Sequence, residues 1–449
     1  MLREPQVIIA GGGLAGCEAA YQCLKKGFRV TMYEMRPSKM TEAHKTGDLA
    51  ELVCSNSFKS LSDVSSSGLL KSEMSEFDSL IIESAKKARV PAGQALAVDR
   101  GVFSNQVNRV LDSFSGFERL DDEVTSIPTE EELKARNEVL IVATGPLTSE
   151  ALSNALRSYC SEEENLFFYD AIAPIVDADT INMSDCFWGD RYGKGDDDYL
   201  NICLNKEQYE CLVSDILAAE KAPLHKFEET PYFECCLPIE VMIERGVETL
   251  RFGPLKPVGF TDPKTGNRPW AVIQLRKENR NGSMLSLVGF QTKMKWPDQK
   301  RVFGKIPGLE SAEFLRLGSV HRNTYINSPR VLDTFLRLRS NKRTFIAGQL
   351  SGVEGYCESS ASGLYAGINA ARIVGGLDPI SLPVDTMMGA LMEYVTCAPG
   401  KGRFQPMNAN LGLLPPIARK KGISKADVKL KKCELALGSL KCWRQSQEL

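Results

Sequence analysis

Hydrophobic positions along the chain fall into short continuous apolar runs separated by helix-spaced segments. Residues 7–10 form an apolar run, residues 14–27 have helical spacing, and residues 28–34 form a second apolar run. Strands of a parallel sheet are covered by helices on both faces, so they appear as continuous apolar runs. The N-terminal pattern therefore predicts a strand–helix–strand unit of a doubly wound α/β sheet.

The same pattern continues through the first third of the chain. Residues 69–89 and 102–111 have helical spacing, and residues 138–144 form a buried strand that enters a Gly-Pro turn. Between them, residues 36–67 are rich in Ser, Asn, Thr and Lys and have few periodic apolar positions. We expect a long loop region there, at the edge of the sheet where loops tend to carry function.

The sequence pattern changes in the middle of the chain. Extended segments alternate with Pro- and Gly-containing turns, which is typical of a β or α+β insertion. A strand at 344–349 and a small-residue helix at 359–374 then restore the α/β pattern. We predict a first segment at 1–195, an inserted domain at 196–322, and a return segment at 323–449.

A glycine-rich turn follows the first predicted strand. Glycine at position 11 permits a tight turn, glycine at 13 lets the backbone approach a pyrophosphate, and glycine at 16 allows close helix packing. The helix N-terminus favours anions. An acid at the end of the second strand can accept hydrogen bonds from the adenosine ribose. This unit predicts a dinucleotide site formed by Gly11, Gly12, Gly13, Leu14, Ala15, Gly16 and Glu34.

A second glycine cluster occurs more than 300 residues later. A simple NAD dehydrogenase has no obvious use for it, whereas a flavoprotein returns a terminal strand and helix to hold the flavin end of FAD. We therefore predict an α/β fold with an FAD-binding doubly wound domain (Rossmann-like, glutathione-reductase type) and an inserted α+β domain. The further cofactor-binding candidates are Gly145, Gly348, Gln349, Gly352, Val353, Glu354 and Gly355.

Composition narrows the class of protein. The 449 residues carry 55 Lys and Arg against 57 Asp and Glu, which argues against a wholly basic nucleic-acid coat protein but allows a local basic patch. No apolar stretch approaches the roughly 20 residues that span a bilayer, and no signal-peptide pattern precedes the first strand. We expect a cytoplasmic protein with reduced thiols and no membrane contact. Its 13 cysteines and 3 histidines lack metal-ligand spacing, so no metal site is predicted.

Two cysteines are candidates for chemistry by their context. Cys54 lies in the loop region after the glycine-rich turn, and Cys236 lies in the insertion beside Cys235. A thiolate is a strong nucleophile and needs a nearby cation, helix N-terminus or base. The alternative for any single cysteine is a structural role in the core. Candidate helpers, among which the sequence does not decide, are Lys59, Arg251, Lys256 and His44.

The C-terminal tail is locally basic. Residues 418–444 carry nine basic residues and two acidic ones, in a chain that is otherwise balanced. Such a patch can contact phosphates, and a solvated helix face is the equally weighted alternative.

Several segments form an ordered set of longer motifs. They are residues 11–16 with 33–37, Glu-Leu-Val-Cys-Ser-Asn-Ser at 51–57, Val-Pro-Ala-Gly at 90–93, Phe-Gly-Pro-Leu-Lys-Pro-Val-Gly at 252–259, Val-Gly-Phe-Gln-Thr at 288–292, His-Arg-Asn-Thr at 321–324, residues 347–349 with 352–356, and Phe-Gln-Pro-Met-Asn-Ala-Asn at 404–410. With this set the chain resembles the bacterial folate- and FAD-dependent tRNA (uracil-5-)-methyltransferases, which make ribothymidine in the T-loop. The resemblance runs from near residue 5 to about residue 417.

The resemblance implies a reaction and its partners. In this family 5,10-methylenetetrahydrofolate supplies the carbon, reduced FAD supplies electrons, NADH or NADPH re-reduces the flavin, and tRNA is the substrate. Cys54 matches the family cysteine of the Leu-Val-Cys-Ser-Asn-Ser motif, and Cys236 matches the cysteine before Leu-Pro-Ile-Glu. Position 235, usually Gly in this motif, is Cys here. The implied roles are addition to uracil C6 by Cys236 and assistance by Cys54, with the reverse order as an alternative.

Three rival interpretations remain at this point. The same chemistry could act on a uridine in ribosomal RNA. The chain could be a relative of the tRNA wobble-uridine-modifying flavoproteins, which are longer and carry an added helical C-terminal domain. It could also be an RNA-binding flavoprotein with no turnover. The oligomeric state is not predicted.

Overall fold

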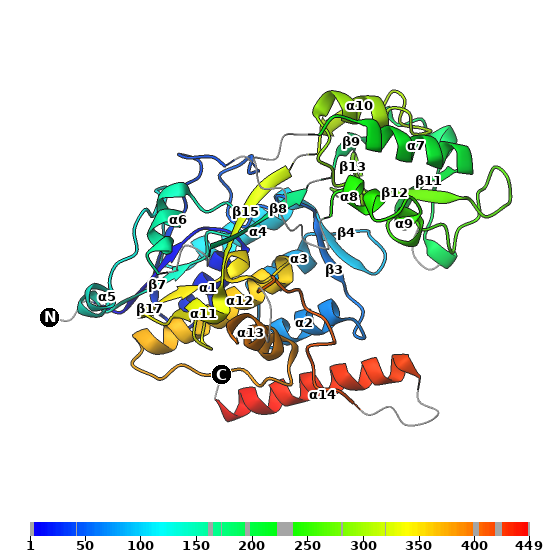
Figure 1. The fold of residues 1–449 in the computed structure, drawn as a ribbon. Helices are drawn as coiled ribbons and strands as arrows, with labels where there is room; N and C mark the ends of the chain where they lie inside the picture. Colours follow the sequence, from blue (N-terminus) through cyan, green and yellow to red (C-terminus); the bar gives the residue numbers. More distant parts are fainter. Residues whose placement is uncertain are drawn as a thin grey trace.

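The fold is described from a computed structural model. It defines residues 4–41, 43–159, 165–171, 173–193, 198–221, 237–279, 282–318, 320–397, 404–417 and 424–447. Two lobes are visible in Figure 1: a larger α/β lobe built from both ends of the chain, and a smaller lobe built from its middle third.

A six-stranded sheet forms the centre of the larger lobe. Its strand order is β16-β17-β7-β1-β2-β6, and all pairings are parallel except that of β16 with β17. The first and last segments of the chain thus meet in one sheet, as expected for a doubly wound fold. The strands are β1 (Gln6–Ala10), β2 (Arg29–Tyr33), β6 (Phe117–Leu120), β7 (Glu138–Val142), β16 (Arg337–Leu338) and β17 (Asn341–Ile346).

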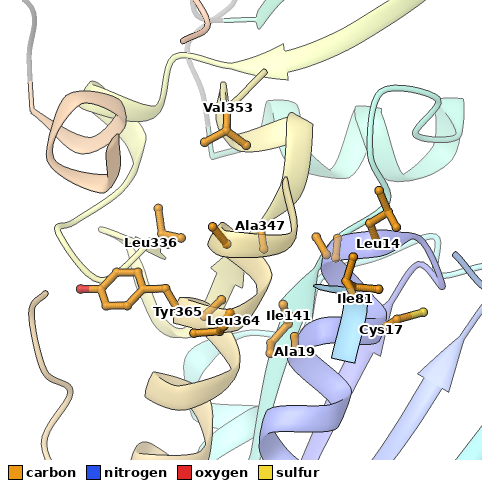
Figure 2. Packing of buried hydrophobic residues seen from close by; sticks show 14 of the residues in the cluster. Leu14, Cys17, Ala19, Ile81, Ile141, Leu336, Ala347, Val353, Leu364 and Tyr365 are labelled. Carbon is orange, nitrogen blue, oxygen red and sulfur yellow. The ribbon is translucent and has the colours of Figure 1, made fainter. Parts of the chain in front are cut away.

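Two helices from opposite ends of the chain pack closely on this sheet. They are α1 (Leu14–Lys25) and α12 (Tyr356–Val374). A Cβ atom at Gly363 would lie 2.2 Å from the carbonyl oxygen of Ala15, and one at Gly367 would lie 2.7 Å from that of Ala19. The small residues of α12 therefore let the two backbones touch. Figure 2 shows the apolar side chains around this contact, with Leu14 and Ala19 on α1 and Leu364 and Tyr365 on α12.

One helix expected from the sequence is two helices. The prediction of a single helix over residues 69–89 is wrong, because the chain forms α2 (Ser66–Ser75) and α3 (Leu80–Lys87). Asp78 between them has φ +55°, a left-handed conformation that ends helical propagation. The Ser79 side chain then accepts a hydrogen bond from the Ile82 N–H and starts the next helix.

Smaller elements surround the main sheet. The long loop region contains one strand, which joins a three-stranded sheet of β3 (Ser57–Ser60), β5 (Ala95–Val98) and β4 (Arg89–Val90). A two-stranded antiparallel ladder, β8 (Asn165–Ala171) with β15 (Val320–Ile326), connects the two lobes. The other helices of this lobe are α4 (Arg100–Asp112), α5 (Glu130–Arg136), α6 (Glu150–Arg157), α11 (Ser328–Val331), α13 (Met387–Thr396), α14 (Lys425–Ser446) and the 3₁₀ turn η6 (Gly348–Ser351).

The smaller lobe has its own antiparallel sheet and core. Its strand order is β10-β11-β12-β13-β9-β14, and its buried residues form a cluster separate from that of the larger lobe. The sheet consists of β9 (Ile175–Asp177), β10 (Cys186–Trp188), β11 (Tyr199–Leu204), β12 (Ala271–Lys277), β13 (Met284–Leu287) and β14 (Phe314–Arg316). Its helices are α7 (Lys206–Ala218), α8 (Ile239–Glu244), α9 (Thr249–Phe252), α10 (Trp296–Phe303) and the short turns η2 (Ala178–Thr180), η3 (Met183–Asp185) and η4 (Arg191–Gly193). The first of these strands begins before residue 196, and the domain boundaries themselves stay a prediction.

Candidate active site

A cleft opens at the carboxyl ends of the central parallel strands. The space within it is about 1010 Å³, part of which is open solvent. In doubly wound folds this edge of the sheet is where nucleotides bind. The predicted site residues that line it are Gly11, Gly13, Leu14, Ala15, Glu34, Gly145, Gly348 and Gln349.

The three spaced glycines of the first turn have three different environments. Gly11 has φ +102°, and a Cβ atom there would lie 2.6 Å from the carbonyl oxygen of Ala143. At Gly16 a Cβ atom would lie 1.9 Å from the Gly11 carbonyl oxygen, so this glycine is needed for packing. A Cβ atom at Gly13 would meet no protein atom within 4 Å, although Gly13 lines the cleft. Gly13 therefore leaves room for a ligand rather than for another part of the chain.

Glu34 lies at the end of β2 and is held by two partners. Its Oε2 accepts a hydrogen bond from the Gly12 N–H at 2.8 Å, and its Oε1 pairs with Arg36 Nε at 2.9 Å. Burial alone would raise the pKa of Glu34, but the hydrogen bonds and charge of Arg36 outweigh it and lower the pKa. Arg36 also pairs with Glu51 at 3.0 Å. Glu34 is thus a fixed carboxylate at the position where a ribose acceptor is expected.

The return segment brings the second glycine cluster to the same cleft. Gly348 and Gln349 line it directly, whereas Gly352, Val353, Glu354 and Gly355 are not among its lining residues. Met407 pairs with this loop, because its N–H donates to the Gly352 carbonyl at 3.0 Å and its carbonyl accepts from the Glu354 N–H at 2.8 Å. The loop that carries the second cluster is therefore supported by the segment at 404–417.

Cys54 lies on a loop, residues 51–56, that borders the cleft at Glu51 and Val53. The hydroxyl of Tyr356, which also lines the cleft, accepts hydrogen bonds from the N–H groups of Cys54 at 2.9 Å and Ser55 at 3.1 Å. Burial raises the pKa of Tyr356, so this hydroxyl is neutral. The cysteine loop and the N-terminus of α12 thus form one wall of the site.

Two arginines hold the carbonyl side of the cysteine loop. Arg100, at the start of α4, donates to the carbonyl of Leu52 and, at 3.4 Å, to that of Cys54. Arg316, on β14 of the smaller lobe, donates to the carbonyl of Val53 at 2.6 Å. Neither was predicted from the sequence. Arg316 is 263 residues from Val53 in the sequence, and no local pattern signals the contact.

The smaller lobe touches the cysteine loop at a second point. The Asn56 amide donates to the carbonyls of Val98 at 3.0 Å and Lys277 at 2.9 Å. Arg100 in turn pairs with Glu278 at 2.9 Å. The end of β12 is therefore packed directly against the candidate catalytic loop.

The helpers proposed from the sequence have other contacts in the structure. Lys59 pairs with Glu358 at 2.9 Å, and Arg251 lies 3.7 Å over the ring of Trp270. His44 lines the cleft and bonds to Thr41 Oγ1 at 2.7 Å. Among the described residues, the Lys256 side chain makes no hydrogen bond or ion pair with the cysteine loop. Cys236 and its neighbour Cys235 lie outside the described residues, so their roles stay predictions.

Residues 418–423 of the basic tail lie outside the described residues, and three of its described basic side chains contact other parts of the chain. On α14, the Lys432 ammonium donates to the carbonyls of Leu411 at 2.9 Å and Leu414 at 3.2 Å. Lys441 pairs with Glu76 at 3.4 Å, and Arg444 lies 5.8 Å from the ring centre of Phe77. These contacts dock α14, which runs along one edge of the larger lobe, onto the body of the protein (Figure 1).

Two kinds of feature are absent from the described residues. No helix there combines the length and apolar composition that a bilayer-spanning segment requires. No group of three or more His, Cys, Asp or Glu side chains there is arranged to hold a metal ion.

The glycine turn, the carboxylate at the end of β2 and the returning helix α12 define a doubly wound domain of the dinucleotide-binding class. Two crystal structures of Aquifex aeolicus GidA have the same fold. One aligns with a TM-score of 0.70 at 17% identity, covering 99% of this chain and 73% of that one. The other aligns with a TM-score of 0.69 at 17% identity, covering 97% of this chain and 76% of that one. The predicted fold class is confirmed.

Sequence comparisons define the family. The model described as "Glucose inhibited division protein A" (GIDA) matches residues 6–378. The methylenetetrahydrofolate–tRNA-(uracil-5-)-methyltransferase TrmFO of Geobacter sulfurreducens is 53% identical over 438 residues, 97% of this chain and 98% of its own. That of Aquifex aeolicus is 52% identical over 417 residues, 93% of this chain and 92% of its own. The chain belongs to the GIDA family and, within it, to the tRNA (uracil-5-)-methyltransferases. The resemblance found in the motifs is confirmed.

Proposed function

We propose that this protein methylates C5 of a uridine in the T-loop of tRNA, with 5,10-methylenetetrahydrofolate as the carbon donor and FAD as its resident cofactor. The single observation that carries the proposal is the placement of Cys54 at the border of a dinucleotide cleft, held by a residue of that cleft. A thiol beside a cofactor cleft is the arrangement that reductive one-carbon transfer to a base requires.

The residues of the cleft fit FAD. Gly13 presents bare backbone to open space, α1 directs its N-terminus at the same place, and Glu34 is a fixed carboxylate at the ribose position. We assign the pyrophosphate to residues 11–16 and the flavin end to Gly348 and Gln349. Bound FAD, reduced by NADH or NADPH, supplies the electrons that convert a methylene group into a methyl group.

The thiols have the task of activating uracil. C5 of uracil is a poor nucleophile, and thiolate addition at C6 gives it enolate character. A second group must then remove the C5 proton so that the thiolate can leave. We assign addition to Cys236 and the assisting role to Cys54. The target base must leave its loop to reach them.

Mass spectrometry of tRNA after incubation with the protein, labelled methylenetetrahydrofolate and NADPH tests the proposal. We expect labelled 5-methyluridine in the T-loop from the wild type and none, or nearly none, from Cys54→Ala or Cys236→Ala protein that retains its flavin. Cys211→Ala, an exposed cysteine of the smaller lobe, is the matched control and should keep activity. Normal product from both site variants would refute the cysteine assignment.

The same experiment separates the alternatives. If product forms on a ribosomal RNA fragment but not on tRNA, then ribosomal RNA is the substrate instead of tRNA. Binding of tRNA without any product from the wild type would favour an RNA-binding flavoprotein. Parallel reactions with NADH and NADPH would identify the reductant.

A further inference from the structure

Three cationic side chains from three separate segments converge beside the cysteine loop. Lys45 comes from the loop region after β2, Arg100 from the start of α4, and Arg316 from β14 of the smaller lobe. Arg100 and Arg316 both bond to carbonyls of residues 52–54. Lys45 is exposed, and its backbone N–H donates to Glu51 of the cysteine loop at 2.9 Å. We call Lys45, Arg100 and Arg316 the cation cluster.

Carboxylates neutralise the cation cluster only in part. Arg100 forms an ion pair with Glu278 at 2.9 Å. Of the three, only Arg100 has a carboxylate ion pair among the described residues. The charges of Glu51 on Lys45 and of Glu278 on Arg316 offset the repulsion only in part. Glu51, whose carboxylate accepts from the Lys45 N–H, also pairs with Arg36.

The charges within the cluster repel one another. Burial, followed by the charges of Arg316 and Arg100, lowers the pKa of Lys45. Burial and the charge of Arg100 likewise lower the pKa of Arg316. Folding alone gains little from bringing three like charges together in a partly buried place with a single close counterion, Glu278. Such an arrangement is typical of a site that receives an anion.

The position of the cluster identifies the anion. It lies at the cysteine loop, on the side where the smaller lobe approaches. A nucleotide whose base reaches Cys54 carries its own phosphodiester with it, and guanidinium and ammonium groups are the usual phosphate contacts in RNA recognition. We propose that the cation cluster binds a phosphate of the RNA strand next to the target uridine. The proposal rests on the proposed function, because it takes RNA as the substrate.

The basic tail does not provide an equivalent site in the described part of the chain. Lys432 and Lys441 are engaged with backbone and carboxylate groups of the protein itself. The cation cluster combines three cations and one close carboxylate with proximity to a candidate catalytic thiol, which favours it over the described part of the tail.

Binding of tRNA to the flavin-loaded protein at several salt concentrations tests the proposal. The probe is a fluorescently labelled, unmodified tRNA transcript, and the variants are Lys45→Gln, Arg316→Gln and the double variant. Each lost phosphate contact lowers the slope of log affinity against log salt by about 0.7–0.9. We expect each single variant to lose about one contact and bind several-fold more weakly, and the double variant to lose about two. Arg316→Lys should restore most of the binding.

Lys305→Gln is the matched control. Lys305 is an exposed lysine of the smaller lobe that forms an ion pair with Asp215 at 2.8 Å. Asp215 also forms an ion pair with Arg301 at 3.4 Å, and this second pair does not involve Lys305. This variant should leave the salt slope unchanged. Flavin content and thermal unfolding of every variant show whether the protein is intact.

Two results would overturn the proposal. Unchanged tRNA affinity and salt slope in the double variant would show that the cluster serves the cysteine loop alone. An unchanged slope with a raised KM for methylenetetrahydrofolate would assign the cluster to the folate carboxylates. Because tRNA binding is measured without turnover, a wild-type protein that binds tRNA through the cluster but forms no product would contradict only the proposed function.

Discussion

Replacing Gly13 with valine should remove the dinucleotide while leaving the fold intact. Gly13 has φ −77° and ψ −172°, which valine adopts without strain. Its Cβ atom would meet no protein atom within 4 Å, so the Cβ atom itself adds no overlap. The remaining cost is that of a poor N-cap residue, about 1 kcal/mol. Three added carbon atoms would stand where the backbone must approach a pyrophosphate. We expect FAD affinity to fall at least a hundredfold, roughly 2.7 kcal/mol.

The assay is a fluorescence titration of FAD into flavin-free protein, combined with thermal unfolding of the same samples. Gly438→Val is the matched control, because Gly438 on α14 also faces open space and lies far along the chain from the cleft. Gly16→Ala is the opposite control, since its Cβ atom would lie 1.9 Å from a carbonyl oxygen, and it should yield little folded protein. A Gly13→Val protein with wild-type flavin affinity would refute the assignment of the pyrophosphate to this turn.

Three further predictions concern stability. Arg36→Met leaves the buried carboxylate Glu34 uncompensated and should lower the unfolding free energy by about 3–5 kcal/mol in a denaturant titration; a loss below 1 kcal/mol would contradict this. Burial raises the pKa of Glu73 to about 7, so its contribution to stability is present below the ordinary carboxylate pKa and is lost as the pH rises through about 7. Glu73→Gln should remove a decline of roughly 3 kcal/mol between pH 5 and pH 8, and parallel pH profiles of the two proteins would exclude it. Gly363→Ala should cost about 1–3 kcal/mol or more, because its Cβ atom would lie 2.2 Å from the Ala15 carbonyl; an unchanged melting temperature would show that the helices can separate.

Local patterns predicted the parts of the fold that depend on neighbours in sequence. The run at 7–10, the glycine turn and Glu34 fall where they were expected, because strand burial and the turn geometry are set within about thirty residues. The break at Asp78 was missed, since a left-handed non-glycine residue leaves no clear mark in the sequence.

The surroundings of Cys54 depend on tertiary contacts and could not be predicted in the same way. Arg316 reaches the loop from the smaller lobe, and Tyr356 reaches it from a segment about 300 residues further along the chain. The motif that contains Tyr356 could be recognised by resemblance, but the hydrogen bonds of its hydroxyl follow only from the fold. Cationic helpers were expected near the thiol, and the structure provides arginines that no spacing rule would select.

The contacts of Lys432 give the C-terminus an influence over cofactor content. This lysine, on α14, donates hydrogen bonds to the carbonyls of Leu411 and Leu414. The segment at 404–417, which contains both leucines, also supports the second glycine loop through Met407. Proteolytic nicking or a bulky fusion near residue 430 would therefore deplete the flavin without touching a single cofactor contact. The yellow colour of a preparation then becomes a simple indicator of an intact C-terminal end, and purification tags belong at the N-terminus.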